Sequence, residues 1–214
     1  WIKELTLSNF RCYDSLKMEF APGINILYGN NALGKTSILE AVHILGLTKS
    51  NRTNDDSVIC KNNGTNYGIK GVLFDQNTKK SVILLYSNKI KKIKYNNNAL
   101  NTLSEFIGMV PVIAYSPGEF IMFGGAPAQR RKFFDMILCQ LSRYYLKTLS
   151  EYKRIIKERN IVLKELQLKP QNGNRDLLEV LTKQMVDKGL RLMAVRKKTI
   201  SKISERASNI HFKM

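Results

Sequence analysis

Residues 29–36 match the pattern G-x-x-x-x-G-K-[ST] in full, and this short run constrains the fold more than any other part of the chain. Gly29 and Gly34 occupy the two glycine positions of the pattern. Glycine permits backbone torsions that other residues rarely adopt, so consecutive N–H groups can turn toward phosphate oxygens. The Lys35 ammonium suits the β and γ phosphates, and the Thr36 hydroxyl suits Mg²⁺. The run therefore predicts a site for ATP with Mg²⁺, formed by Gly29, Asn30, Asn31, Ala32, Leu33, Gly34, Lys35, Thr36 and Ser37.

The segments on either side of this run bear on whether it forms a nucleotide site. Residues 24–28, Ile-Asn-Ile-Leu-Tyr, form a short apolar run that predicts a strand leading into Gly29. Apolar residues recur at helical spacing over 35–47, and Gly46 lies near the expected helix end. A helix that begins near Lys35 directs its N-terminal N–H groups and the positive end of its dipole at bound phosphates. The alternative is a glycine-rich turn from strand to helix with an incidental lysine.

Several other segments of the N-terminal part alternate apolar and polar residues with the period of a β-strand. Residues 48–68 are polar and rich in Asn, Asp and Gly, so they are expected to form loops. Pro111 indicates that the last apolar segment is an edge strand or begins there. Early antiparallel strands and a βα phosphate loop predict an α/β fold with a mixed sheet, whose further strands are expected at residues 2–7, 16–20, 69–74, 81–86, 90–95 and 109–115.

From about residue 128 the sequence changes to a helical pattern. Residues 170–174, Pro-Gln-Asn-Gly-Asn, interrupt it, and two helices around a short break predict an antiparallel helical hairpin. A true coiled coil and two amphipathic helices packed on the head are both open. The first seam repeats every seven residues at Leu149, Ile156 and Leu163, and the second is formed by Leu178, Leu181, Met185, Leu192 and Val195. The predicted domains are an ATP-binding lobe and a helical arm, over residues 1–126 and 127–214.

The chain carries a large excess of positive charge, with 35 Lys and Arg against 17 Asp and Glu and a formal net charge of +18. A net charge of about 2–8 suffices for the solubility of a small domain, so the excess indicates a polyanionic partner, either nucleic acid or an acidic membrane surface, and we expect nucleic acid. The alternative is a solvated basic surface, and part of residues 89–95 is equally explained as an edge strand guarded by lysines. The candidate DNA contacts are Lys91, Lys92, Arg130, Arg131, Lys153 and Arg154.

Cysteine spacing and hydropathy argue against several other classes of protein. The three cysteines stand far apart and form no C-x-x-C pair, which argues against a disulfide framework and a zinc site. No apolar run reaches the ~18 residues of a transmembrane helix, and the N-terminus opens on a strand pattern rather than a signal peptide. We therefore expect a cytoplasmic protein with no membrane partner.

Hydrolysis of ATP also requires an acidic residue on a second strand, which holds Mg²⁺ and orients water. The best match to an apolar run that ends in an acid is residues 72–75, Val-Leu-Phe-Asp. Gln76 and Asn77 follow as a hairpin turn signal, so Asp75 is predicted to be a turn residue. We therefore assign no catalytic residue within this chain.

Several separated motifs resemble a known family. Residues 2–11 are similar to the opening of SMC-like ATPases, whose first strand ends in an Asn-Phe-Arg turn. Asn31 and Ala32 fit the narrower loop form of these proteins, G-x-N-[GA]-x-G-K-[ST]. Three further segments resemble the RecF family of bacterial recombination-repair ATPases, and they follow in the same order at residues 47–53, 115–117 and 130–135.

The resemblance implies an ABC-type ATPase head with a short helical arm. Members of this family bind double-stranded or gapped DNA and form homodimers with two ATP molecules between the heads. They act with RecR and RecO mediators in the bacterial nucleoid and support loading of a recombinase at single-strand gaps. Their acidic Mg²⁺ motif and signature motif lie further toward the C-terminus than this chain extends, and the chain begins at Trp1 rather than Met. We therefore expect an N-terminal fragment with little ATP hydrolysis of its own, and weak DNA-dependent hydrolysis by the full-length dimer.

The same resemblance implies roles for residues outside the phosphate loop. Arg11 matches an arginine expected beside the phosphates, although it could equally be a surface arginine on a turn. Residues 123–125, Phe-Gly-Gly, resemble the signature motif only weakly. The loop that touches the base or phosphates in relatives corresponds to Ser50, Arg52 and Thr53. The Mg²⁺-sensing glutamine of relatives is missing, and the available substitutes are Ser116 and Glu119.

Two other functions are open from the sequence. One is a self-contained P-loop kinase or hydrolase acting on a small molecule, although the missing second acid and the long basic helices argue against it. The other is a DNA-binding or interaction module with a vestigial phosphate loop.

Overall fold

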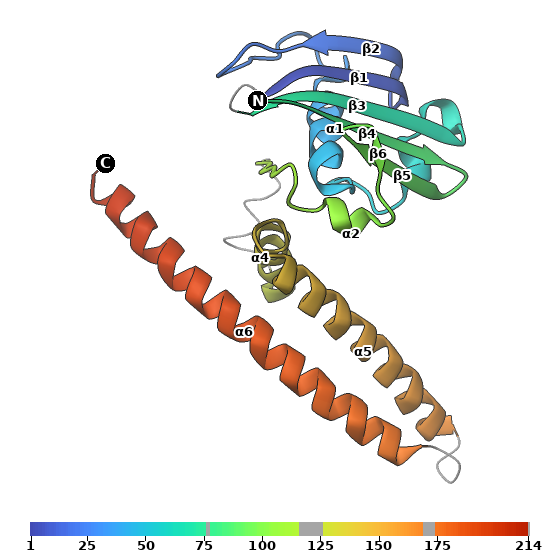
Figure 1. Ribbon diagram of the computed structural model, residues 1–214, viewed down its shortest axis with the longest axis vertical. Helices are drawn as coiled ribbons and strands as arrows, with labels where there is room; N and C mark the ends of the chain where they lie inside the picture. Colours follow the sequence, from blue (N-terminus) through green and yellow to red (C-terminus); the bar gives the residue numbers. More distant parts are fainter. Residues whose placement is uncertain (76–77, 116–125, 169–173, 214) are drawn as a thin grey trace. The chain divides into compact units, whose positions relative to one another are not determined.

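The computed structural model describes residues 1–75, 78–115, 126–168 and 174–213 (Figure 1). The chain divides into two compact units, over residues 1–121 and 122–214, and each has apolar clusters of its own. The first unit carries the phosphate loop, and the second carries the long helices. None of the described helices combines the length and the apolar character that crossing a membrane requires.

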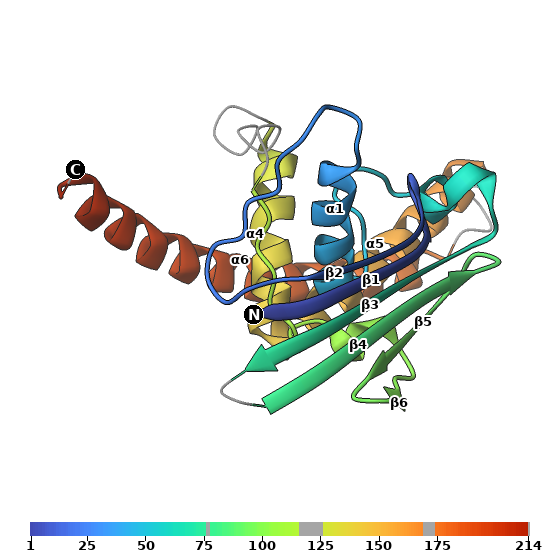
Figure 2. The ribbon, with the colours of Figure 1, turned by 90° about the horizontal axis from the view of Figure 1, so that it is seen from above.

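The first unit is built on a six-stranded sheet with the order β2-β1-β3-β4-β5-β6 (Figure 2). All neighbouring strands pair antiparallel. Alternation along β1 buries Leu5 and Leu7 completely, as expected of a strand with one face on the core. Five predicted strands lie in this sheet and are confirmed, at residues 2–7, 16–20, 69–74, 81–86 and 90–95. The strand bounds are β1 Ile2–Phe10, β2 Tyr13–Glu19, β3 Asn66–Asp75, β4 Thr78–Ser87, β5 Ile90–Tyr95 and β6 Asn98–Ala99.

Helix α1, Lys35–Leu47, lies against one face of this sheet and is confirmed over the predicted residues (Figures 1 and 2). Ile44 and Leu45 are fully buried in the cluster that α1 shares with the strands. The helix approaches closely because Gly71 of β3 has no side chain, and a Cβ there would lie 2.3 Å from Leu45 Cδ2. The remaining short elements are η1 Asp56–Ile59, η2 Lys61–Asn63 and α2 Leu103–Phe106.

Two predicted strands are not formed. Residues 24–28 and 109–115 lie outside every strand of the described chain, and Ile24 and Tyr28 are each 92% exposed. A strand needs the backbone groups of a neighbouring strand as hydrogen-bond partners, and neither segment has such a neighbour in the described part of the sheet. The α/β class is confirmed, but the described sheet is antiparallel because the segment before the phosphate loop does not join it.

Within its described residues, the second unit contains three helices, α4 Pro127–Leu141, α5 Arg143–Leu168 and α6 Arg175–His211. Helices α5 and α6 lie side by side as an antiparallel hairpin, as predicted (Figure 1). Hydrogen bonds and an ion pair fix the antiparallel direction, because residues 144, 151 and 159 of α5 contact residues 191, 188 and 182 of α6 in turn.

The contact seam of the hairpin is confirmed on α6 and shifted on α5. All five predicted seam residues of α6 pack in the two apolar clusters of this unit. On α5 the buried aliphatic residues of the seam are Leu149, Ile155 and Val162, whereas Leu163 is exposed. The apolar spacing of one helix does not by itself decide which of its sides meets the partner helix, and the contact at the second and third predicted positions of α5 falls one residue earlier than predicted.

The carboxylate of Asp135 connects the three helices. Arg196 of α6 donates to it from both Nε and NH2 at 2.8–3.0 Å, and Tyr145 of α5 donates its hydroxyl. Burial and then the hydrogen bond with Asp135 raise the pKa of Tyr145, which keeps its hydroxyl protonated as a donor. This network joins α4 to the N-terminal end of α5 and to α6.

Candidate functional site

The phosphate loop adopts the torsions that its glycines permit. Gly29 and Gly34 have φ angles of 139° and 86°, and a Cβ on Gly34 would lie 2.6 Å from side-chain atoms of the β1–β2 turn. No side chain caps α1, and the N–H groups of its first three residues have no acceptor among the described residues. Unpaired N–H groups at the positive end of a helix dipole favour an anion.

The Lys35 side chain reaches back over this loop. Its Nζ donates to the carbonyl oxygens of Gly29 at 2.7 Å and Asn30 at 2.5 Å. An ammonium group has three N–H donors, so one is left for a phosphate oxygen. Thr36 is exposed at the start of α1, whereas Ser37 is buried, and the crest of the loop is the exposed run of Asn30, Asn31, Ala32 and Leu33.

The β1–β2 turn packs against the end of the phosphate loop. The Tyr13 hydroxyl donates to the Leu33 carbonyl at 3.0 Å, and Cys12 Sγ fills part of the space that a side chain at position 34 would need. Arg11 belongs to the same turn and has a φ of 53°, in the left-handed region. Arg11 therefore lies in the segment that adjoins the loop, and its contact with nucleotide stays a prediction.

A buried carboxylate, Glu40 of α1, holds this arginine. Arg11 donates to it from Nε at 3.0 Å and from NH2 at 2.7 Å, while Arg11 NH1 donates to the Val58 carbonyl at 3.0 Å. Ser50 Oγ donates to Glu40 at 2.5 Å, and Arg52 NH1 donates at 3.2 Å. Four donors on one carboxylate satisfy both of its oxygens, as a buried charge requires.

The loop after α1 is ordered by the same group. Ser50 Oγ accepts from the N–H groups of Arg52 at 2.9 Å and Thr53 at 3.2 Å while it donates to Glu40. Glu40 thus connects the turn at residue 11 with the loop at residues 50–53, and these are the two segments that the resemblance assigned to the nucleotide. Their contacts with ATP stay predictions.

The ionisation of Glu40 follows from these contacts. Burial opposes its charged form, but the hydrogen bonds from Arg11 and Ser50 and the charges of Arg11 and Arg52 outweigh burial, so the pKa of Glu40 lies below its ordinary value of 4.5. Glu40 is a permanent anion near neutral pH, and it offsets one of the two arginine charges.

The donor set around the loop suits a polyphosphate, and it would supply one ligand for Mg²⁺. Thr36 would contribute a hydroxyl oxygen, as predicted for this position. No group of three or more His, Cys, Asp or Glu side chains is placed to hold a metal within the residues that the structure describes. Asp75 ends β3 at the β3–β4 hairpin and pairs with Lys80 at 2.6 Å, which confirms its prediction as a turn residue.

Sequence reasoning missed Glu40 and Tyr13. Glu40 carried a usable signal, because a glutamate among Ile38, Ala41 and Ile44 on the buried side of α1 must be paired. Its partners were not predictable, since Arg11 lies 29 residues away in the chain. Tyr13 carried no signal, because its role depends on the turn that brings it to Leu33.

The candidate DNA contacts differ in whether their charges are already paired with a carboxylate of the protein and in how exposed they are. Lys91 is only 9% exposed in its side chain, pairs with Asp56 at 2.6 Å and donates to the Thr48 carbonyl at 2.7 Å. Its charge is therefore neutralised within the first unit. Arg154 lies 3.8 Å from Glu158 in an exposed pair, and the exposed members of the set are Lys92, Arg130, Arg131, Lys153 and Arg154.

Some predictions lie outside the described residues. These are the substitutes for the Mg²⁺-sensing glutamine, most of the segment 115–117, the signature-like residues and most of the break between the long helices, which fall at residues 116–125 and 169–173.

Comparison with known proteins places this geometry in a family. The family model described as AAA domain matches residues 4–210. The chain is 37% identical over 211 residues to the DNA replication and repair protein RecF of Streptococcus uberis, and 36% identical over 210 residues to that of Staphylococcus carnosus. These matches cover 99% and 98% of this chain but 57% and 56% of the relatives, so the chain spans little more than half of their length.

Solved structures agree with the sequence relatives. The structure of the recombination mediator protein RecF-ATP in the RecFOR pathway superposes with a TM-score of 0.88 at 29% identity, over 94% of this chain and 54% of that one. A structure from work on ATP-driven dimerization and DNA stimulated activation of SMC ATPases gives a TM-score of 0.51 at 18% identity, over 64% of this chain and 99% of that one, and it shows a shared fold alone.

Proposed function

Because the chain belongs to the AAA domain family and, within it, to the RecF group of SMC-like ATPases, we propose that it binds ATP with Mg²⁺ at residues 29–37 and uses the nucleotide to control binding to DNA. The observation that carries this proposal is the phosphate loop itself. Unpaired N–H groups at the start of α1 and the Lys35 ammonium converge on one place where an anion is favoured.

Each residue of the site has a distinct part in holding the nucleotide. The N–H groups of the loop and Lys35 bind the phosphates, and Thr36 supplies a hydroxyl to Mg²⁺, which would neutralise phosphate charge when bound. Arg11 adds a cation beside the loop, and Arg52 and Thr53 meet the base or phosphates. ATP is the proposed ligand because the ATP-bound RecF structure shares this fold over nearly the whole chain.

DNA is the proposed macromolecular partner. The net charge of +18 supplies the electrostatic attraction, and the curated relatives carry the name DNA replication and repair protein. No base-reading module accompanies the basic residues, so contacts to phosphates without sequence preference are expected. We assign ATP binding to residues 1–126. We assign contact with double-stranded or gapped DNA to the exposed arginines and lysines of the arm, residues 127–214, together with the exposed Lys92 of the ATP-binding lobe.

Assembly and turnover complete the proposal. ATP-dependent homodimerisation, action with RecR and RecO mediators, and a place on the bacterial nucleoid follow from membership of the RecF group. Little hydrolysis is proposed for this chain by itself, because Thr36 is the one Mg²⁺ ligand assigned within it. The whole assembly would hydrolyse ATP weakly and in response to DNA.

A single-turnover experiment tests the ATP site. The chain in excess is mixed with radiolabelled Mg-ATP, and binding and cleavage are followed beside Lys35→Ala and a matched exposed lysine variant, Lys79→Ala. The proposal expects binding that is lost only in Lys35→Ala, with negligible cleavage. ATP binding by Lys35→Ala equal to that of the unaltered chain would contradict the proposal. Lys35-dependent cleavage at an ordinary enzymatic rate would favour a self-contained kinase or hydrolase.

A further inference from the structure

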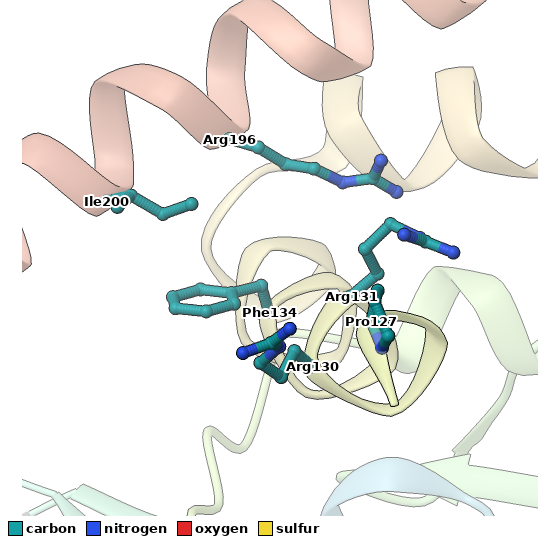
Figure 3. A pocket seen from close by; sticks show the side chains of 6 residues that line it. All are labelled: Pro127, Arg130, Arg131, Phe134, Arg196 and Ile200. Carbon is teal, nitrogen blue, oxygen red and sulfur yellow. The ribbon is translucent and has the colours of Figure 1, made fainter. Parts of the chain in front are cut away.

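A pocket of about 250 Å³ lies in the arm between α4 and α6 (Figure 3). Figure 3 shows the Phe134 ring lying between Ile200 and Arg130, with the arginine side chains around the hollow. All of its lining residues belong to the second unit, and they are Pro127, Arg130, Arg131, Phe134, Arg196 and Ile200.

The charge around this pocket is unbalanced. Of the three lining arginines, Arg196 is paired with a carboxylate: it donates from Nε and NH2 to the oxygens of Asp135, which does not itself line the pocket. Arg130 and Arg131 are exposed, and neither forms an ion pair or a side-chain hydrogen bond within the described residues. Two uncompensated cations on adjacent residues favour an anionic ligand.

The walls of the pocket are suited to a flat apolar group. Phe134 is half-buried, so part of its ring is accessible, and Ile200 and Pro127 supply aliphatic surface. Arginine side chains bring aliphatic stems and planar heads that stack on aromatic groups. The volume lies below the roughly 300–1,000 Å³ of pockets for drug-sized ligands, which fits one planar ring with its phosphate better than a larger molecule.

We propose that this pocket binds one nucleotide of single-stranded DNA, with its base against Phe134 and its phosphate at Arg130 and Arg131. A duplex keeps its bases stacked and paired, so only an unpaired base can reach an aromatic ring in this way. The inference rests on the proposed DNA function and deepens it, because it names the single-stranded part of a gapped substrate as the arm's ligand. The arm thus discriminates strand type by stacking, and its other cations hold duplex phosphates without such discrimination.

The test measures affinity for two DNAs of equal length, a thymine oligonucleotide and a duplex, by fluorescence anisotropy. The variants are Phe134→Leu and the pair Arg130→Gln with Arg131→Gln, and the matched control is Lys157→Gln with Lys164→Gln, which removes two exposed charges from α5. Phe134→Leu is expected to weaken single-strand binding about tenfold and leave duplex binding within about twofold. The arginine pair is expected to weaken single-strand binding more than the lysine pair does.

Two further measurements keep the test decisive. Phe134→Tyr retains an aromatic ring and should keep single-strand affinity, and thermal melting and circular dichroism show that each variant is folded. The fluorescence of a 2-aminopurine base in the oligonucleotide should be quenched when the unaltered chain binds, and it should be quenched less when the Phe134→Leu variant binds. Equal losses on both DNAs, or no loss in Phe134→Leu, would overturn the proposal.

Free nucleotide is the other source of the same chemistry. Thymidine monophosphate that competes for the pocket as well as the oligonucleotide does would overturn the assignment to a DNA strand. If the unaltered chain bound neither DNA, the proposed DNA function would fail and the pocket proposal with it. Duplex binding that persists while Phe134 has no effect would overturn the pocket proposal alone.

Discussion

Glu40 and Arg11 form a two-point ion pair in which Arg11 Nε and NH2 each donate to a different oxygen of the carboxylate, at 3.0 and 2.7 Å. The Glu40 side chain is fully buried, and it also accepts from Ser50 and Arg52. One carboxylate in the helix that follows the phosphate loop therefore sets the positions of both arginines assigned to the nucleotide. Planar, two-point pairing fixes orientation as well as distance.

Glu40→Gln keeps the shape of the side chain and removes its charge, so it should weaken ATP binding by about 10- to 100-fold, as expected for about 1.5–3 kcal/mol per hydrogen bond to a charged group. The reason is that Arg11 and the loop at residues 50–53 lose the acceptor that places them. Isothermal titration with Mg-ATP measures the change, with the exposed Glu19→Gln as the matched control.

A double-mutant cycle separates positioning from a general structural effect. In a chain that already carries Arg11→Ala and Arg52→Ala, Glu40→Gln should have a much smaller further effect on ATP affinity, because both arginines through which Glu40 acts are gone and only Ser50 remains. The same loss in both backgrounds would contradict the positioning role.

Acid should weaken the first unit through Glu40. Its pKa in the folded chain lies below the ordinary value of 4.5, so the ionised carboxylate stabilises the fold above that value, and this stabilisation is lost as the pH falls through the folded pKa. The free energy of unfolding, measured by urea denaturation, should therefore decline less steeply below about pH 4.5 in Glu40→Gln than in the unaltered chain. Parallel pH profiles for the two proteins would rule out this contribution.

Alkylation should report nucleotide binding at Cys12. Cys12 is exposed and its Sγ adjoins the phosphate loop, whereas Cys60 is buried and burial raises the pKa of Cys139 to about 11. Because the thiolate is the reactive form, iodoacetamide should modify Cys12 first, as peptide mass spectrometry would show. Mg-ATP should slow that reaction several-fold in the unaltered chain and have no effect in Lys35→Ala. An unchanged rate at Cys12 under saturating Mg-ATP would place the nucleotide elsewhere.

Asp135→Asn should loosen the junction of the arm helices. It leaves Arg196, a half-buried cation, without its carboxylate, and the expected cost is about 1–3 kcal/mol, below the largest losses for fully buried pairs. The control is Asp187→Asn, which breaks an exposed pair with Arg191 and should cost less than about 1 kcal/mol. Hydrogen exchange of the α4 and α5 amides measures the difference in local stability between Asp135→Asn and Asp187→Asn. Equal protection in the two variants would argue against the network.

The parts of the fold that the sequence predicted are those governed by local pattern. The phosphate loop, α1 and the antiparallel strands follow from glycine positions, helical spacing and alternation within short windows. Residues 24–28 carry the same kind of strand signal, yet they form no strand, because pairing depends on a neighbour and not on the segment itself.

The candidate site divides in the same way. The places of Lys35 and Thr36 at the start of α1 were predictable from the spacing of the loop residues, and their contacts with nucleotide and Mg²⁺ stay predictions. The partners of Glu40 were not predictable, because its four donors come from two separate segments, the turn at residue 11 and the loop at residues 50–53, that only the folded chain brings together. For Lys91 a basic run predicts a DNA contact, which stays a prediction, and the tertiary structure supplies Asp56 as an ion-pair partner that the run did not indicate.

Neighbouring lysines of β5 should therefore respond differently to substitution. Lys92 is exposed, so Lys92→Gln should lower the slope of log affinity for duplex DNA against log salt by up to about 0.9, the effect of one lost phosphate contact. Lys91→Gln should leave that slope unchanged, because its charge is already paired with Asp56, and it should instead lower the free energy of unfolding. Affinity measured between 50 and 200 mM salt, roughly the range over which such contacts are resolved, provides the comparison. A reduced salt slope in Lys91→Gln with unchanged stability would mean that DNA draws Lys91 out of its ion pair, and Asp56→Asn would then strengthen DNA binding.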